Sequence, residues 1–127
     1  MKKQIEHVCN FHDSFGIKNN YIPTEKLSEE VVLLRHRLMA EENEEYLEAC
    51  RNGDLVEIAD ALGDMMYILC GTILSHGLQD KIENVFEEIQ KSNMSKLGSD
   101  GKPIYREDGK IMKGPDYFKP DIKKIIS

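Results

Sequence analysis

The sequence of 127 residues predicts an all-α protein, a bundle of about four helices that ends in a short C-terminal β-hairpin and an extended tail. Helices are indicated because apolar residues recur about every 3.6 positions through most of the chain, and because capping residues stand between the apolar stretches. The tail is set apart by its Gly, Pro and Asp content after Leu97. We expect one domain over residues 1–127, with a helical body of about 1–97 and a basic loop and hairpin tail of about 98–127.

The first half of the chain contains two predicted helices. The first covers residues 2–14 and ends near Gly16, and the loop-like segment IKNNYIPTEKL follows it. Ser28 is a suitable N-cap for a second helix that runs to about Asn52. Gly53 then suits the position just after a helix, where glycine is favoured.

Two further helices and a hairpin are expected. Asp54 and the glutamate three residues later fit a capping box for a third helix, which runs to about His76 and stops at Gly77. In the same way, Asp80 and the glutamate three residues later open a fourth helix, which ends near Lys96. In the tail, the β-capable pieces KPIYRE and KIMKG flank an Asp-Gly pair, which is a hairpin pattern.

Charge and cysteine content limit the function classes. The first 95 residues carry 9 Lys/Arg and 18 Asp/Glu, whereas residues 96–127 carry 8 Lys/Arg and 5 Asp/Glu. An acidic body with a basic tail is not typical of a nucleic-acid-binding protein, and no stretch predicts a signal peptide or a membrane span. Three cysteines without a CxxC pattern indicate reduced thiols in a cytoplasmic protein.

The acidic run of the second helix divides between two faces when it is plotted at 100° per residue. Glu44 and Glu48 fall on a polar face, whereas other glutamates continue the apolar stripe. The residues of that stripe lie within roughly 100° of one another on the helical repeat: Val31, Leu34, Leu38, Glu41, Glu42, Glu45 and Ala49. The sequence therefore predicts that three glutamates face inward.

The third helix is apolar almost all round and carries three acids on one stripe. These acids are Glu57, Asp60 and Asp64. Both inward sets lie within about three turns of Gly53, so two neighbouring helices are expected to bring six carboxylates to a similar height.

Buried carboxylates are unfavourable neighbours, since each loses hydration and like charges repel. No equal set of Lys or Arg shares these stripes, although Arg35 lies at the edge of the first. A divalent cation relieves such repulsion better than protonation does. Ligands that are all oxygens favour Mg²⁺ first and Mn²⁺ second.

The fourth helix is expected to form a third wall of the site. Asn93 and Lys96 extend its apolar stripe at the carboxyl end, where they would contact a ribose or a phosphate. His12 in the first helix is a further candidate, with a partly exposed helix histidine as the alternative. No Glu-x-x-His pair, Walker loop or nucleophile elbow occurs, which argues against a di-iron site, a P-loop and a serine triad.

The spacing Glu41-Glu42-x-x-Glu45 followed by Glu57-x-x-Asp60 resembles the E-E-x-x-E … E-x-x-D motif of the all-α nucleoside triphosphate pyrophosphohydrolases. That superfamily includes MazG-like proteins, dimeric dUTPases, dCTP pyrophosphatases and phosphoribosyl-ATP pyrophosphohydrolases. The resemblance extends over nearly the whole chain, because FHDSFG, KSNMSKL, DGKPIYREDGK and KGPDYF are similar to segments of the MazG-like, phosphoribosyl-ATP pyrophosphohydrolase-like branch. The gap between the two halves of the motif is short, and the chain has no tryptophan to stack on a base.

The resemblance implies a role for each matching residue. The Mg²⁺ ligands would be Glu42, Glu45, Glu57 and Asp60, and Asp64 joins them from its place on the stripe. Glu41 would be a further ligand or the base that orients water, and Glu42 is the second candidate catalytic residue. Substrate contacts would come from Asn93, Lys96, Lys113 and Tyr117.

The expected reaction is hydrolysis of a nucleoside triphosphate between the α and β phosphates, which gives a monophosphate and pyrophosphate. The expected role is house-cleaning removal of non-standard or excess nucleotides, with dUTP favoured. Two alternatives stay open: phosphoribosyl-ATP hydrolysis in histidine synthesis, and a non-catalytic regulator that binds a nucleotide or a metal. We also expect a homodimer or a dimer of dimers, because the third helix is too apolar for one chain to cover.

Overall fold

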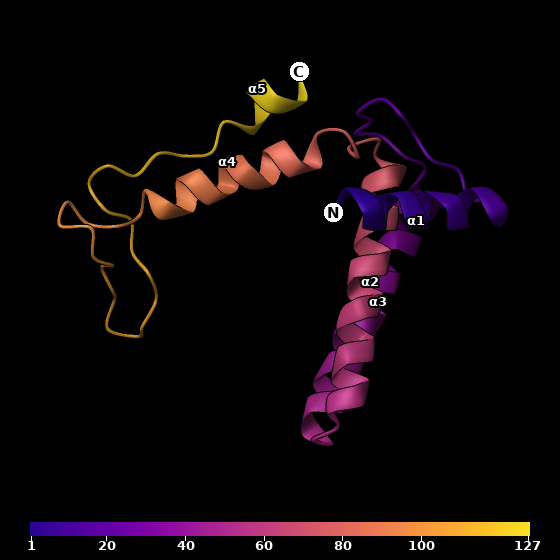
Figure 1. Ribbon diagram of the computed structural model, residues 1–127, viewed down its shortest axis with the longest axis horizontal. Coiled ribbons are helices and arrows are strands. Elements are labelled where there is room, and N and C mark those ends of the chain that lie inside the picture. The colour runs from indigo at the N-terminus through magenta and orange to yellow at the C-terminus, as the bar shows by residue number, and fades with distance from the viewer. The chain divides into compact units, whose positions relative to one another are not determined.

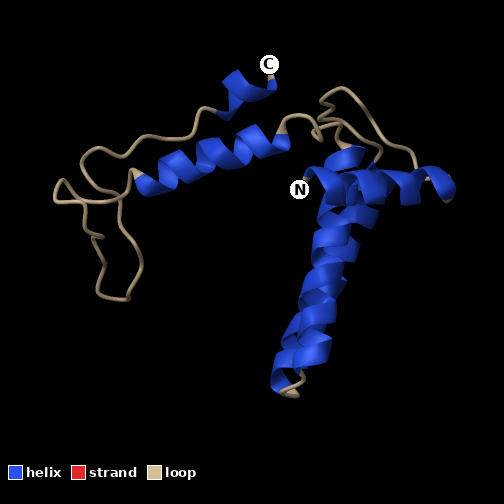
Figure 2. Cartoon of the chain, in the orientation of Figure 1, coloured by secondary structure: helices blue, strands red, loops and turns tan.

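The computed structural model describes residues 1–127 and contains five helices and no sheet (Figures 1 and 2). The helices are α1 (Lys2–Ser14), α2 (Glu29–Arg51), α3 (Leu55–Ser75), α4 (Ile82–Met94) and α5 (Ile122–Ile126). The all-α prediction is confirmed. The short helix α5 was not predicted from the sequence, where this segment was expected to be extended.

The caps of α2 and α3 are formed by the residues that the sequence indicates. The hydroxyl of Ser28 accepts a hydrogen bond from the backbone N–H of Val31 at 3.3 Å, and the Asp54 carboxylate accepts one from the N–H of Glu57 at 3.2 Å. Between the two helices Gly53 has a φ of 63°, a left-handed conformation that glycine adopts without strain. The turn at Gly53 folds α2 and α3 back on each other as an antiparallel pair.

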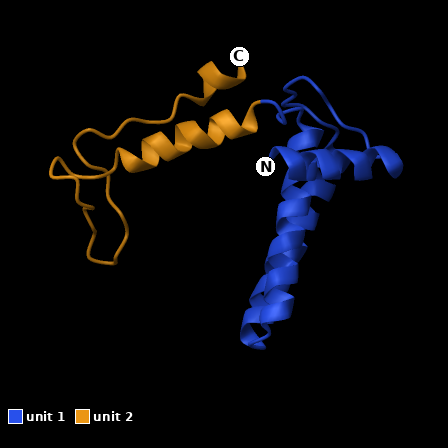
Figure 3. Cartoon of the chain, in the orientation of Figure 1, with its two compact units in different colours: residues 1–80 blue, residues 81–127 orange.

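The chain divides into two compact units, residues 1–80 and residues 81–127 (Figure 3). In the first unit, α3 packs against both α2 and α1. Its apolar core consists of Ile5, Val8, Ala49, Ala61, Cys70, Ile73 and Leu74. The loop between α1 and α2 is held on the end of α3, where the backbone N–H of Asn20 donates to the carbonyl of Leu74 at 2.9 Å.

In the second unit, α4 packs against α5. The tail is tied to the end of α4, because the Ser92 hydroxyl donates to the carbonyl of Phe118 at 2.8 Å and the Phe118 N–H donates to the Ser95 hydroxyl at 3.1 Å. The division after Asp80 therefore groups α4 with the tail instead of with a body of residues 1–97. That residues 1–127 act as a single domain stays a prediction.

The predicted C-terminal hairpin does not form as a pair of strands. Tyr105 and Ile111 make a single isolated antiparallel bridge, and Gly109 turns the chain between them with a φ of 85°. The turn was therefore predicted at the right place, but strands were wrong. All of residues 101–113 are exposed, so these short pieces have no apolar surface to pack against, and an isolated two-stranded hairpin is marginal in water.

The outer faces of α3 are apolar and largely uncovered within one chain. Leu55 and Val56 are 77% and 76% exposed, and Leu62, Met66 and Leu69 are each nearly half exposed. By length and composition α3 would suffice to cross a membrane, a property that core helices of soluble proteins share. The same property is expected of a helix whose remaining surface is buried by a partner.

Candidate active site

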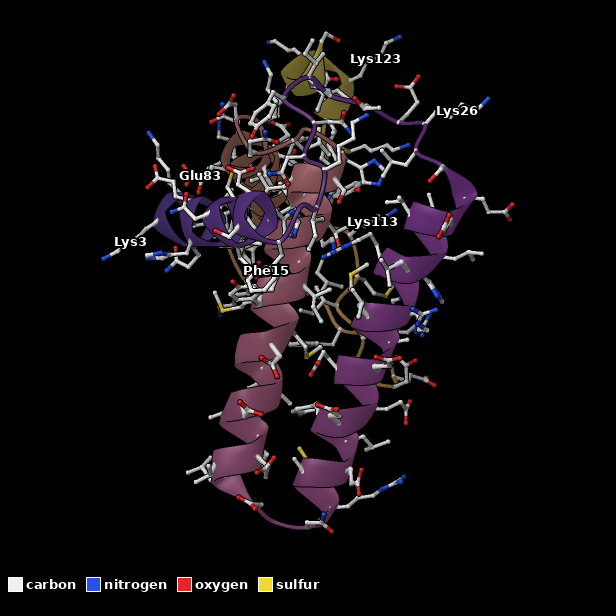
Figure 4. All side chains as sticks on the ribbon, turned by 90° about the vertical axis from the view of Figure 1, so that its right-hand side faces the viewer. Lys3, Phe15, Lys26, Glu83, Lys113 and Lys123 are labelled. Carbon is white, nitrogen blue, oxygen red and sulfur yellow. The ribbon has the colours of Figure 1, made fainter.

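Carboxylates of α2 and α3 meet between the two helices. Glu42 and Glu45 come from α2 and Asp64 from α3, and one oxygen of each lies within 4.8 Å of the others. Glu42 and Asp64 are equally far along the chain from Gly53, so the turn folds them to the same height. Figure 4 shows carboxylate oxygens between the antiparallel helices, in the half near the connecting turn.

Glu42 is the central member of this carboxylate cluster. Its Oε2 atom is buried and receives no hydrogen bond. Burial, the largest cause, acts together with the neighbouring Glu45, Asp64 and Asp60 carboxylates to raise the pKa of Glu42 to about 7. The pKa of Asp64 is also raised, first by burial and then by Asp60 and Glu45. The cluster therefore concentrates negative charge between the two helices.

Two predicted ligands of α3, Glu57 and Asp60, are more exposed than Asp64. Asp60 is exposed, but its charge acts on both Glu42 and Asp64, which lie near it. Glu57 is exposed in the first turn of α3, where its backbone N–H bonds to Asp54. The structure thus brings Glu42, Glu45 and Asp64 together with Asp60 nearby, and it does not bring Glu57 into the group.

The predicted inward position of Glu41 is wrong for this chain. Its carboxylate lies 3.7 Å from the Arg37 guanidinium, one turn earlier on α2, and its side chain is 58% exposed. Glu41 and Glu42 are 100° apart on the helix, so only one of them faces α3 directly. The catalytic role assigned to Glu41 stays a prediction.

His12 is buried, which corrects the expectation of a partly exposed histidine. Its side chain is packed on α3 with 2% of its surface exposed. The ring Nδ1 lies 2.6 Å from the amide oxygen of Asn19, an acceptor, so Nδ1 carries the hydrogen. Its predicted contact with substrate stays a prediction.

The other predicted substrate residues belong to the second unit. Asn93 is exposed at the end of α4, and Lys96 is half-buried just after it. In the tail, the Lys113 ammonium stands 4.8 Å from the centre of the Tyr117 ring, a cation–π contact. Their roles in binding substrate stay predictions.

Arg35 is a buried charged residue between α2 and α3 whose burial was not predicted from the sequence. It is 8% exposed, and its guanidinium bonds to neutral groups of α3. Desolvation lowers its pKa. The sequence places Arg35 at the edge of the apolar stripe of α2, but its spacing does not indicate that the side chain is buried.

The carboxylate cluster fits a divalent cation. Ligands on opposite sides of Mg²⁺ lie roughly 4.2 Å apart, so carboxylate oxygens within 4.8 Å need only small side-chain rotations to share one ion. The unpaired Oε2 of Glu42 supplies a buried oxygen with no other partner. The donor set is entirely oxygen, as hard cations require.

Comparisons with known proteins agree with this geometry. Residues 8–93 match the family described as phosphoribosyl-ATP pyrophosphohydrolase, and this match runs from the middle of α1 to the last turn of α4. A solved structure of a candidate NTP pyrophosphohydrolase from Exiguobacterium sp. 255-15 is 25% identical, with a TM-score of 0.55 over 97% of this chain and 93% of that chain. No curated protein matches the chain. The resemblance stated from the motif is thereby confirmed: the chain is a pyrophosphohydrolase that belongs to the phosphoribosyl-ATP pyrophosphohydrolase family, within the all-helical NTP pyrophosphohydrolases.

Proposed function

We propose that the chain hydrolyses a nucleoside triphosphate between the α and β phosphates in a reaction that depends on Mg²⁺, with Mn²⁺ as a substitute. The observation that carries this proposal is the buried, unpaired carboxylate oxygen of Glu42 between Glu45 and Asp64. A triphosphate is negatively charged and binds divalent cations. Carboxylates therefore repel it directly and can bind it only through a metal ion held between them.

The residues of the cluster would bind the metal ion and accept a proton in the proposed reaction. Glu42, Glu45 and Asp64 would hold the ion, with Asp60 beside them, and the ion would supply charge neutralisation and activation of water. A carboxylate of the cluster accepts the proton of the attacking water. The water oxygen bonds to the α-phosphorus, the bond from that phosphorus to the bridging oxygen breaks, and pyrophosphate leaves. Lys96 and Lys113 are assigned to the phosphates as point charges.

Release of pyrophosphate from a panel of substrates tests the proposal. The panel contains dUTP, the other dNTPs, the four NTPs and phosphoribosyl-ATP, each with Mg²⁺, Mn²⁺ or EDTA. We expect turnover with a divalent cation and none with EDTA, with dUTP the favoured substrate. Failure of every substrate, with a nucleotide or metal still bound, would instead indicate a non-catalytic regulator.

Phosphoribosyl-ATP is the second candidate substrate. The description of the matching family favours it, since the match covers residues 8–93 and therefore both helices that carry the carboxylates. The two candidates differ at the sugar and base, while the α–β phosphate bond that breaks is the same. A ratio of kcat/KM values between dUTP and phosphoribosyl-ATP decides between them.

We also propose that two copies of the chain associate through the uncovered face of α3, either as a homodimer or as a dimer of dimers. The proposal is supported by the exposed apolar residues Leu55, Val56, Leu62, Met66 and Leu69, which lie on one helix. Light scattering after size-exclusion chromatography is expected to give a mass of twice 14.6 kDa or a multiple of that. A mass of one chain at micromolar concentration would contradict it.

A cytoplasmic, house-cleaning role completes the proposal. It is supported by the three cysteines, none of which forms a disulfide. Activity that is greatest on a non-standard nucleotide such as dUTP would agree with this role.

A further inference from the structure

We propose that Arg35 is a positioning residue, which holds α2 and α3 in the axial register at which their carboxylates share one cation. This inference rests on the proposed metal-dependent function. Metal ligands from two helices must meet within a few tenths of an ångström. Apolar packing between the helices is not directional and does not by itself fix how far one slides along the other.

The guanidinium of Arg35 reaches from α2 to two groups of α3. Its Nε donates to the Thr72 hydroxyl at 3.1 Å, and its Nη2 donates to the carbonyl of Ile68 at 2.8 Å. The Thr72 hydroxyl in turn donates to the same carbonyl at 2.9 Å. A slide by the rise of one residue, about 1.5 Å, would break both bonds from Arg35.

These contacts lie on the faces that carry the metal ligands. Arg35 precedes Glu42 by roughly two helical turns on α2, and Ile68 and Thr72 follow Asp64 by roughly one and two turns on α3. The turn at Gly53 fixes the two helices at their other ends. The carboxylate cluster therefore lies between two fixed points, the turn and the Arg35 contact.

Gly71 provides the space for this contact. A Cβ atom at this position would overlap the Nη2 of Arg35 and would stand 3.0 Å from the Nε2 of His12. Gly63, two turns earlier on the same helix, has nothing within 4 Å of its hypothetical Cβ. The two glycines are thus a matched pair: one is required by a close approach to Arg35 and the other is not.

The binding of Mn²⁺, measured by electron paramagnetic resonance without substrate, tests the proposal in the folded full chain. We expect Arg35→Met to retain its helical circular dichroism and to bind Mn²⁺ at least about tenfold more weakly, the scale of losses when residues that orient metal ligands are removed. The control Arg37→Met makes the same chemical change on the exposed face of α2 and is expected to bind as the natural chain does. A folded Arg35→Met with unchanged Mn²⁺ affinity would overturn the proposal.

Two milder variants decide the question if Arg35→Met does not fold. Thr72→Val keeps the shape of the side chain but removes an acceptor of Arg35, and Gly71→Ala displaces the guanidinium. Both are expected to weaken Mn²⁺ binding severalfold. Gly63→Ala is expected to raise Tm by a few degrees, as alanine does in an open helix position, and to leave Mn²⁺ binding unchanged. Normal Mn²⁺ affinity in both Thr72→Val and Gly71→Ala would overturn the proposal.

A general loss of stability is distinguished by a core variant remote from the contact. Ile5→Val in α1 is expected to lower Tm without changing Mn²⁺ affinity. Suppose instead that Ile5→Val lost as much Mn²⁺ affinity per degree of lowered Tm as Arg35→Met does. The weaker binding would then follow from lost stability, and a register role for Arg35 would be wrong. If the natural chain bound no Mn²⁺, the proposed function would fail and this inference with it. Normal binding in both the natural chain and Arg35→Met, with loss in Glu42→Gln, would remove this inference alone.

Discussion

Replacing Glu42 with glutamine is expected to lower the rate of pyrophosphate release by about 100-fold or more. Loss of a residue that only orients a metal ligand already costs up to about 100-fold, and Glu42 is proposed to be a ligand itself. Glutamine keeps the size and one oxygen of the side chain but removes the charge at the centre of the cluster. The metal-free variant is expected to have a higher Tm than the natural chain at pH 8, because a buried like charge is removed. Initial rates of pyrophosphate release at saturating Mg²⁺ and thermal melts in EDTA measure both effects.

Glu44→Gln is the matched control for this substitution. Glu44 lies on the exposed side of α2, two positions along from Glu42, so the same change there is expected to leave rate and Tm nearly unchanged. An active Glu42→Gln enzyme would remove Glu42 from the metal site. Loss of helical structure in Glu42→Gln would show that the residue is needed for folding instead.

Removing divalent cations is expected to destabilise the protein at pH 8 and to have little effect at pH 5. The pKa of Glu42 rises from about 4.5 to about 7 on folding. The folded state therefore binds more protons between these values, so metal-free stability falls as the pH rises through this window and levels off above it. A cation binds the deprotonated carboxylates, so its stabilisation grows over the same window.

The size of this effect follows from mass action. At a Mg²⁺ concentration about 100 times its dissociation constant, binding contributes about 2.7 kcal/mol, which corresponds to roughly 10 °C in the Tm of a chain of this length. Thermal melts with and without EDTA across pH 5–8 measure it. In Glu42→Gln the difference between the two conditions is expected to be small. An equal EDTA effect at every pH would contradict a carboxylate site.

Local signals in the sequence were sufficient to predict the helices of the first unit. Ser28, Asp54 and Gly53 act through backbone groups of their own or adjacent turns, so their effect is visible without the tertiary structure. The predicted strands of the tail failed for the opposite reason. Strand formation depends on a surface to pack against, which a pattern of β-capable residues does not supply.

The candidate site was predicted to the level of helix faces but not of individual side chains. Glu42 and Glu41 are neighbours that differ by 100° in direction, and they form the two edges of a stripe roughly 100° wide, so the stripe alone does not show which of them faces α3. The contact of Glu41 with Arg37 resolved this difference. Arg35 and His12 were missed as buried residues because their burial requires Gly71 on another helix, and no spacing in the sequence indicates that approach.

The short connection between α2 and α3 has a consequence for how the protein folds. The cluster is built by two consecutive helices joined at Gly53, so its contacts are close in sequence and form early. The repulsion between the carboxylates then opposes the pairing of these two helices as they form. Divalent cations in the cell would in this way act on the nascent chain as well as on the finished enzyme, and the metal would assist the assembly of the site that later uses it.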